Sequence, residues 1–270
     1  MGKKVRIIDI SSTIEHEDPK DPEVYRPKIQ YVDHRAGAVQ IKQMFGVDPK
    51  DLVYSGGLGW SIELVTLTTH SGTHVDAPWH YHPMAEGRKA KTIDECPLEW
   101  FYGDGVRLDL RHKKPGEEIT VEDLKEALDK IGYKLKPGDI VLIWTGTDKK
   151  AGTPAYFDQP GLSREAVLWL VEQGVRVIGI DAWSLDRTFA KQAEEYKRTG
   201  DGTKIWPAHF AGIEKEYCHI EKLANLDKIP KPYGFKVACF PVKIAKASAG
   251  WCRAVVIIEE EEGADQEGEQ

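Results

Sequence analysis

The sequence of 270 residues lacks three features that would each indicate a particular class of protein. It has no stretch near the roughly 18 consecutive apolar residues that a membrane-spanning helix requires. Its start, MGKKVRIIDISS, has neither a long apolar run nor the small-residue cleavage site of a signal peptide. Its four cysteines contain no CxxC pair. We therefore expect a soluble protein with ordinary thiols in a reducing, cytoplasmic setting.

An excess of basic residues is also absent, since 37 Lys and Arg stand against 44 Asp and Glu. Residues 259–270 (EEEEGADQEGEQ) hold seven of these acidic residues and no basic one, so the rest of the chain is balanced. Without a basic field, neither nucleic acid nor an anionic membrane is an expected partner. We predict one domain over residues 1–258, followed by a solvated, disordered acidic tail over residues 259–270.

The order of the predicted elements favours an α/β core. Apolar runs at 105–110, 140–145 and 175–181 predict strands, of which the last two are buried on both faces. Capping residues begin predicted helices over Asp123–Ile131 and Ser163–Gln173 between these strands. Strand–helix alternation of this kind is typical of α/β proteins. Further strands are expected at 5–11, 60–69, 235–242 and 255–258.

Two segments carry little regular pattern. Residues 15–59 are rich in turn formers and predict mostly loop, with a short helix over Ala36–Phe45. Residues 184–208 are polar and contain glycine, so they predict a long loop that could act as a lid.

The densest group of possible metal ligands lies in HSGTHVDAPWHYHP, residues 70–83. On one continuous strand, His70 and His74 would lie ~13 Å apart at ~3.3 Å per residue, too far apart to share an ion. The chain must therefore fold back between them, and Gly72 tolerates the backbone angles that this requires. The possible ligands in the segment are His70, His74, Asp76, His80 and His82.

The remainder of the segment completes the predicted geometry. Asp76 lies two residues beyond His74 and can share its face of a strand. Pro78 then breaks the strand and redirects His80. We predict that His70, His74 and Asp76 converge on one ion with His80 nearby. A solvated loop with incidental histidines is the alternative, but it would not require interleaved Gly, Asp and Pro.

The spacing alone does not select the chemistry. His74-x-Asp76 with a distant His209 or His219 also matches the two-histidine, one-carboxylate triad of non-haem iron oxygenases, so an oxygenase is an alternative enzyme. A protein that binds a metal or another ligand without turnover is a further alternative.

The segment HSGTHVDAPWH resembles the HxGTHxDxPxH signature of the cyclase family of metal-dependent hydrolases, which includes bacterial kynurenine formamidase (arylformamidase) and isatin hydrolase. Residues 179–186, GIDAWSLD, resemble the family's GIDTPSID, with Ala-Trp in place of Thr-Pro. Residues 219–226 resemble its late Glu-containing segment, and the matches together span residues 5–258. The resemblance implies a swivelling β/β/α-type fold, a mixed α/β architecture whose central sheet partly curls into a barrel with helices outside. The matched signature positions are His70, Gly72, Thr73, His74, Asp76, Pro78 and His80.

The resemblance also implies roles for these residues. His70, His74 and Asp76 would be metal ligands, and His80 would be the catalytic base or acid beside the metal. The presence of His80 at its signature position counts against a protein without turnover. Zinc suits the histidine-rich donor set and manganese suits its carboxylate share.

A second ion is implied by the two-metal members of the family, in which the aspartate bridges and a later His and a Glu twelve residues on complete the site. His209 and Glu221 have this spacing. His219 competes with His209 for the role, and Glu216 competes with Glu221. One or two divalent ions per chain are therefore expected.

Together these observations predict a metal-dependent hydrolase that cleaves the C–N bond of an acyl or cyclic amide. Aromatic residues near the predicted site could form the walls of a pocket for a flat substrate, although each could equally be part of the core. The resemblance implies a homodimer or homotetramer with the active site near a subunit contact. The candidate aromatic walls are Trp79, Trp183, Trp206 and Phe210.

Overall fold

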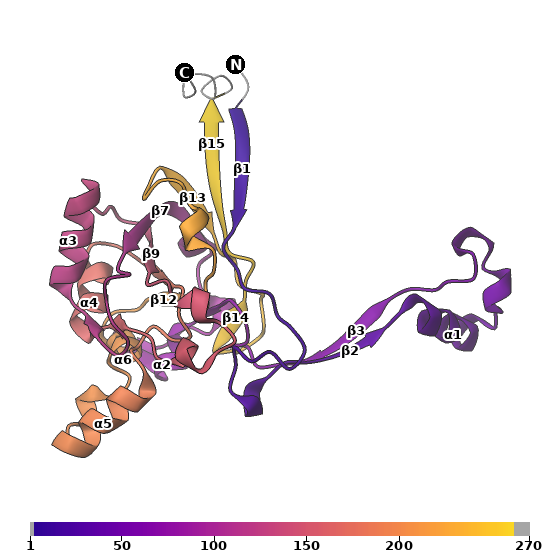
Figure 1. The fold of residues 1–270 in the computed structure, drawn as a ribbon, viewed down its shortest axis with the longest axis horizontal. Coiled ribbons are helices and arrows are strands. Elements are labelled where there is room, and N and C mark those ends of the chain that lie inside the picture. The colour runs from indigo at the N-terminus through magenta and orange to yellow at the C-terminus, as the bar shows by residue number, and fades with distance from the viewer. Residues whose placement is uncertain (1–2, 262–270) are drawn as a thin grey trace. The chain divides into compact units, whose positions relative to one another are not determined.

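The computed structural model describes residues 3–261, and its contacts divide the chain into two compact units (Figure 1). Residues 14–68 form the smaller unit, and the rest of the described chain forms the larger one. Compact units of this kind do not test the domain boundaries, so the single domain expected over residues 1–258 stays a prediction. Of the acidic tail expected over residues 259–270, the first three residues belong to the last strand, and residues 262–270 lie outside the described part.

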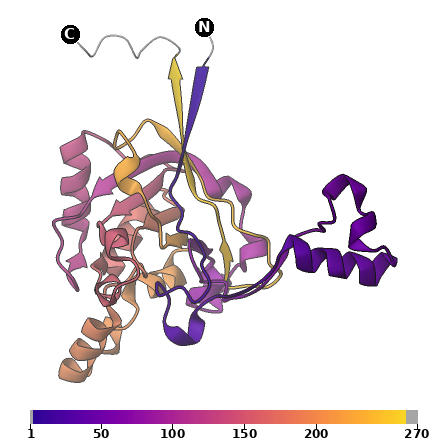
Figure 2. The same ribbon diagram turned by 45° about the vertical axis from the view of Figure 1, so that its right-hand side comes forward.

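The larger unit is built on a sheet of nine strands among the described residues, and the sheet curls into a half-barrel (Figures 1 and 2). Its order is β1-β15-β13-β7-β9-β11-β12-β4-β14. Strands β7, β9, β11 and β12 run parallel, and the other pairs are antiparallel. The predicted mixed α/β class is confirmed. The bounds are β1 Lys3–Asp9, β4 His74–Asp76, β7 Tyr102–Asp109, β9 Ile140–Trp144, β11 Val177–Ile180, β12 Cys218–Glu221, β13 Phe235–Ala238, β14 Ala249–Trp251 and β15 Val255–Glu261.

Strand β9 shows how the apolar runs form the core. Its residues alternate between faces, so Val141 and Ile143 pack in one hydrophobic cluster and Ile140 and Leu142 in another. Buried residues of helices α3 (Val121–Ile131) and α4 (Arg164–Glu172) belong to the first cluster. The expectation that this strand is covered on both faces is confirmed.

The capping residues act as the sequence indicates. The Thr120 hydroxyl accepts from the Asp123 amide, and the Asp123 carboxylate accepts from the Thr120 amide, which forms a capping box for α3. The Ser163 hydroxyl accepts from the Ala166 amide and begins α4.

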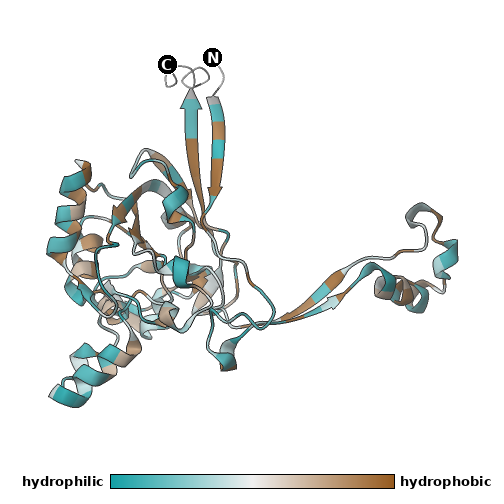
Figure 3. Cartoon of the chain, viewed as in Figure 1, coloured by the Kyte–Doolittle hydropathy of each residue, from teal (hydrophilic) through white to brown (hydrophobic). Residues whose placement is uncertain are grey.

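Three further helices belong to the described part of the larger unit. Helix α5 falls within residues 184–208, which the sequence pattern predicted as loop. It is hydrophilic along most of its length (Figure 3), and Gln192 is its single buried residue among those described. Phe189, Ala193 and Tyr196 recur at helical spacing, but they stand among charged residues. These helices are α2 Pro78–Tyr81, α5 Phe189–Thr199 and α6 Pro207–Glu214.

Short elements complete the larger unit. Strands β5 (Met84–Ala85) and β6 (Arg88–Lys89) form one small sheet, and β8 (Glu118–Ile119) and β10 (Gly161–Leu162) form another. The 3-10 helices of both units are Glu23–Tyr25, Pro49–Asp51, Val53–Ser55, Ile93–Glu95, Leu98–Phe101, Thr147–Lys150, Pro154–Phe157, Gly202–Lys204 and Leu226–Lys228.

The smaller unit consists of the antiparallel pair β2 (Lys28–Val32) and β3 (Ile62–Thr66) with helix α1 (His34–Phe45) between them. A Cβ added at Gly37 would lie 1.8 Å from the Trp60 carbonyl oxygen, so glycine is required at this close approach. Many of its large apolar side chains are exposed instead of packed. They include Tyr31, Val39, Met44, Phe45, Val53, Tyr54, Ile62 and Leu64.

The structure also shows the state of the cysteines and the character of the helices. All four cysteines are buried and unpaired, as expected of ordinary thiols. Within residues 3–261, no helix is both long enough and apolar enough to cross a membrane.

Candidate metal centre

Two neighbouring antiparallel strands, β4 and β12, form the base of the candidate site. In their register, His219 lies opposite Asp76 and Glu221 lies opposite His74. Because alternate residues of a strand point to the same face, each strand contributes two of these side chains to one side of the sheet. All four side chains are at most 9% exposed.

A turn before β4 brings His70 back towards this face. Gly72 has φ +60°, in the left-handed region that favours glycine, and its carbonyl oxygen lies 2.8 Å from His74 Nδ1. His70 Nδ1 lies 2.8 Å from Asp76 Oδ1 and 3.3 Å from His74 Nε2. The predicted reversal at Gly72 is therefore confirmed. We call His70, His74 and Oδ1 of Asp76 the outer group, because His70 remains 27% exposed.

The second carboxylate oxygen of Asp76 faces a different set of residues. Asp76, His209, His219 and Glu221 each offer a ligand atom, and these atoms lie within 4.8 Å of one another. His219 Nε2 is 3.0 Å from Asp76 Oδ2 and 3.1 Å from Glu221 Oε1. His209 Nε2 is 3.8 Å and 3.6 Å from the same two oxygens. We call these four buried residues the inner group.

Asp76 shows whether these residues fit a metal ion. Both of its carboxylate oxygens are buried, and neither has a hydrogen-bond partner among the described residues. Burial would raise the pKa of this carboxyl, but His70, His80 and the other histidines around it hold the pKa well below its usual range. A buried carboxylate without hydrogen bonds is costly unless a cation compensates it. The donor set of imidazoles and carboxylates is one that divalent metal ions bind.

The inner group is held in place by partners on its far side. The Asp186 carboxylate contacts His209 Nδ1 and also accepts from the amides of Ala208 and His209 at the start of α6. The Leu185 amide donates to Glu221 Oε1 at 3.0 Å. A carboxylate on the remote nitrogen of a histidine is the usual support of a metal ligand, since it fixes the tautomer and the ring orientation.

His80 lies at the rim of the site on the short helix α2, which begins at Pro78 as the sequence predicts. Its Nε2 is 3.8 Å from Asp76 Oδ2, its ring centroid is 4.1 Å from that of His70, and its side chain is 22% exposed. Burial lowers the pKa of His80 to about 3, and this outweighs the opposite effect of Asp76. His80 is therefore neutral at pH 7 and can accept a proton.

Of the four aromatic residues expected near the site, Trp206 and Phe210 lie beside it. The Trp206 ring stacks on His209 with 4.2 Å between centroids and 7° between planes, and its centroid is 5.1 Å from that of His80. Phe210 packs edge-on against Trp206 at 5.7 Å.

The other two aromatic residues are less directly placed. Trp183 packs between Phe157 and Phe189, and the Lys222 amine, which donates to the His70 carbonyl oxygen, lies 5.7 Å from its ring. Trp79 is adjacent to His80 in sequence, but the residue is 37% exposed, with the Lys89 amine 5.9 Å from its ring.

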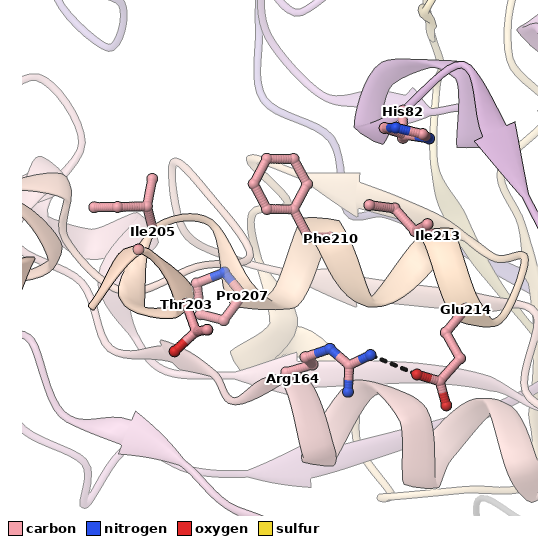
Figure 4. A pocket seen from close by; sticks show the side chains of 9 residues that line it. His82, Arg164, Thr203, Ile205, Pro207, Phe210, Ile213 and Glu214 are labelled. Atoms are coloured by element: carbon pink, nitrogen blue, oxygen red, sulfur yellow. Dashed lines mark hydrogen bonds and ion pairs between the residues drawn. The ribbon is translucent and has the colours of Figure 1, made fainter. Parts of the chain in front are cut away.

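Helix α6 separates the inner group from a surface pocket of about 450 Å³ (Figure 4). The helix buries His209 with Ala208 and Ala211, whereas Phe210 and Ile213 face the pocket. An ion pair between Arg164 and Glu214 crosses the pocket wall. None of the inner or outer group lines this pocket. The lining residues are His82, Arg164, Gly202, Thr203, Ile205, Pro207, Phe210, Ile213 and Glu214.

The sequence left two pairs of competing residues, and the structure gives the position of each. His209 and His219 both belong to the inner group, so the two histidines do not exclude each other. Glu221 is in the group, whereas the Glu216 side chain forms an ion pair with Lys91.

Three other side chains complete the description of the site. His82 lies outside both groups and its Nδ1 accepts from the Met84 amide. Sequence reasoning did not single out Tyr81 or Asp186, whose side chains contact His219 and His209. The similarity of residues 179–186 to GIDTPSID was a signal for Asp186, whereas nothing in the spacing pointed to Tyr81.

The curled sheet and its two clusters of histidine and carboxylate side chains define an α/β protein with a candidate metal centre. The family model described as "Putative cyclase" matches residues 8–187, two thirds of the chain, and the chain belongs to this family. It is 30% identical over 194 residues to a protein named kynurenine formamidase from Erythrobacter litoralis, covering 71% of this chain and 74% of the relative.

Isatin hydrolases are also similar to the chain. It is 25% identical over 210 residues to the isatin hydrolase of Roseibium aggregatum, covering 72% of this chain and 73% of the relative. The crystal structure of an isatin hydrolase bound to the product analogue thioisatinate has a TM-score of 0.72 at 20% identity, covering 95% of this chain and 93% of that one. This likeness confirms the expected fold.

Proposed function

We propose that this protein is a metal-dependent hydrolase that cleaves the C–N bond of an acyl or cyclic amide. The observation that carries the proposal is the buried Asp76 carboxylate, which faces ring nitrogens on two sides and has no hydrogen-bond partner among the described residues. The relatives named kynurenine formamidase and isatin hydrolase support an amide substrate. They also favour a hydrolase over the iron oxygenase that the spacing alone allows.

Two ions would be held by residues that share Asp76. The outer group would bind one ion through His70, His74 and Asp76, and Asp76 with His209 and Glu221 would bind the other. When bound, such an ion lowers the pKa of a coordinated water from ~15.7 to ~7 and polarises the substrate carbonyl. Zinc and manganese are the proposed metals, because the donors are imidazoles and carboxylates without thiolates.

His80 is the proposed general base and acid. It is partly exposed and its Nε2 is 3.8 Å from Asp76 Oδ2, so it is close enough to the proposed ions to contact a water bound there. It would take a proton from that water and return it to the leaving nitrogen of the amide.

The substrate is proposed to lie against the aromatic residues at the rim. Trp206 and Phe210 are on the His80 side, and Trp183 is on the side of Lys222 and His70. The indole Nε1 atoms of Trp183 and Trp206 are buried and lack a hydrogen-bond partner within the described residues, so either could donate to a polar atom of the substrate. Trp79 has the least support as a substrate contact, because Lys89 lies over its ring.

A homodimer or homotetramer is also proposed. The smaller unit exposes large apolar side chains on α1, β2 and β3, and clusters of this kind mark protein–protein contacts. A second copy of the chain would cover them. The cytoplasmic setting and the absence of a nucleic-acid or membrane partner stay predictions from the sequence.

The test measures metal content and amide hydrolysis together. Wild-type protein is expected to contain one or two zinc or manganese ions per chain and to hydrolyse members of a panel of aryl formamides, lactams and cyclic imides. Asp76→Ala should lose both properties. His80→Gln should keep its metal and lose about 10²–10⁴-fold in turnover. His82→Gln is the matched control, because His82 lies outside both groups.

Three outcomes would contradict the proposal. Protein that binds no divalent metal after reconstitution would remove its basis. Turnover that needs O₂, a reducing cosubstrate and iron would favour the oxygenase. Hydrolysis unaffected by Asp76→Ala would place the reaction elsewhere in the molecule.

A further inference from the structure

The hydrogen bonds around Tyr81 determine which nitrogen of His219 carries a proton. The Tyr81 hydroxyl donates to the main-chain oxygen of Asp76 at 3.3 Å. A tyrosine hydroxyl has one hydrogen to donate. Where the hydroxyl donates to Asp76, its 2.9 Å contact with His219 Nδ1 is one in which the imidazole donates. In the neutral ring the hydrogen is on Nδ1, and Nε2 carries a lone pair.

That lone pair faces oxygens that are themselves only acceptors. His219 Nε2 lies 3.0 Å from Asp76 Oδ2 and 3.1 Å from Glu221 Oε1. All three side chains are at most 9% exposed. Three electron-rich atoms at such distances repel one another unless a proton on Nε2 or a metal ion lies between them, and the convergence of four ligand atoms favours the metal ion.

We propose that His219 is a fourth protein ligand of the inner ion, together with Asp76, His209 and Glu221, and that Tyr81 is the residue that positions it. This inference rests on the proposed function for the presence of an ion, and it adds a ligand beyond the signature and the His209–Glu221 pair.

The spacing of the donor atoms supports four-coordinate binding. Ligand atoms about 2.1 Å from a tetrahedral ion lie about 3.4 Å from one another. The four measured distances among Asp76 Oδ2, Glu221 Oε1 and the two Nε2 atoms run from 3.0 to 3.8 Å, on both sides of that value. The strand register explains the placement, because His219 is directly opposite Asp76 and Glu221 follows it on the same face.

Two ions of different character follow from this arrangement. The inner ion would have four protein ligands, all at most 9% exposed, which is the pattern of a closed structural site. The outer ion would have three ligands, one of them the partly exposed His70, which leaves a position for water. The inner ion should be retained, and the outer ion should exchange with solvent.

His219→Leu tests the proposal through metal content and spectroscopy instead of activity. Wild type is reconstituted with Co²⁺, dialysed against a competing chelator and measured for ions per chain and for visible absorption. We expect one slowly released tetrahedral ion in the wild type. In His219→Leu that absorption should disappear and the slowly released ion should be lost, while binding at the outer group persists. His82→Leu is the control and should match the wild type.

Tyr81→Phe is the second variant, because it preserves the ring and removes only the hydroxyl. We expect its inner ion to bind about 10–100-fold more weakly, with the tetrahedral absorption retained at high Co²⁺ concentration. Circular dichroism of each variant excludes unfolding as the cause.

The outcomes distinguish this inference from the function on which it rests. If His219→Leu retains the slowly released ion and its spectrum, His219 is a protonated partner of the carboxylates and the inference is overturned, while the hydrolase proposal stands. If the wild type binds no ion at all, the proposed function fails first.

Discussion

Asp76 and Asp181 are both fully buried aspartates of the same sheet, but their surroundings are opposite. Asp76 has no hydrogen-bond donor on either oxygen among the described residues, and the histidines around it hold its pKa well below the usual range despite burial. Asp181 follows β11 and accepts from the Thr145 amide, the Thr145 hydroxyl and the Gly146 amide. Burial nevertheless raises the pKa of Asp181 to about 7.

The difference separates a binding site from a structural contact. Asp181 ties the end of β11 to the turn after β9, and its donors are uncharged amide and hydroxyl groups that satisfy its oxygens. The partners of Asp76 are imidazoles, each able to donate a lone pair to a cation. A buried carboxylate surrounded by bases therefore indicates a cation site, whereas one surrounded by amides and hydroxyls indicates local structure.

The largest expected effect comes from comparing two single variants, with the same substitution made at Asp76 in one and at Asp181 in the other. Asp76→Asn should remove the shared ligand, so we expect loss of both ions and a fall in turnover of at least about 10³-fold. Asp181→Asn should keep the metal and retain turnover within about threefold. Metal analysis and hydrolysis of the most active amide check this pair. Equal losses of metal and of turnover in the two variants would contradict the assignment of Asp76 to the metal site and of Asp181 to local structure.

The second prediction concerns the pH dependence of stability. The pKa of Asp181 is about 7 when folded and about 3.9 when unfolded, so its contribution to stability is greatest below pH ~4 and is lost as the pH rises towards 7. The full difference corresponds to about 4 kcal/mol. Relative to wild type, Asp181→Asn should therefore gain stability between pH 4 and 7 and show no further change above that range.

Urea unfolding of both proteins in the presence of chelator, from pH 4.5 to 8.5, measures this gain without interference from metal binding. A constant offset between the two proteins across this range would mean that the hydrogen bonds from Thr145 and Gly146 keep Asp181 ionised.

The outer group could be predicted from sequence because its geometry is local. His70, His74 and Asp76 lie within seven residues, and the need for a reversal at Gly72 follows from strand dimensions alone. The inner group depends on long-range contacts. His219 reaches Asp76 only through the register of β12 on β4, and no sequence pattern fixes that register.

The fold shows the same division. The apolar run of β9 and the capping residues of α3 and α4 predicted these elements correctly, since each signal is contained in a short window. Helix α5 was missed because its contacts are polar. Gln192 links it to the main chain of Arg187 and Trp206, and its few apolar positions, Phe189, Ala193 and Tyr196, are outnumbered by charged residues.

A third prediction tests Asp186, whose partners include both amides, like those of Asp181, and an imidazole, like those of Asp76. The imidazole is that of His209 in the inner group. In Asp186→Asn, the side-chain amide would place either its N–H₂ group or a weaker acceptor against His209 Nδ1. The tautomer of His209 that has its hydrogen on Nδ1, and a lone pair on Nε2 directed at the ion, would then no longer be favoured. We expect about 10–100-fold weaker binding of the inner ion, measured by chelator competition. Unchanged affinity would make Asp186 only a helix cap.

The smallest effect is expected at an exposed carboxylate. Asp104 accepts from Lys236 at 2.7 Å and from Lys136 at 3.2 Å, which lowers its pKa, but its side chain is 45% exposed. Solvent and salt screen such pairs, so Asp104→Asn should cost less than about 1 kcal/mol at neutral pH. Because the folded-state pKa is lowered, this contribution should disappear as the pH falls below about 4.

Unfolding of Asp104→Asn at low and high salt measures the difference. A loss of several kcal/mol that persists in salt would mean that the number of charged partners determines the strength of a carboxylate contact. A small loss that salt removes would mean that burial determines it. In that case the absence of solvent around Asp76, more than the number of its histidines, makes its charge available to hold an ion.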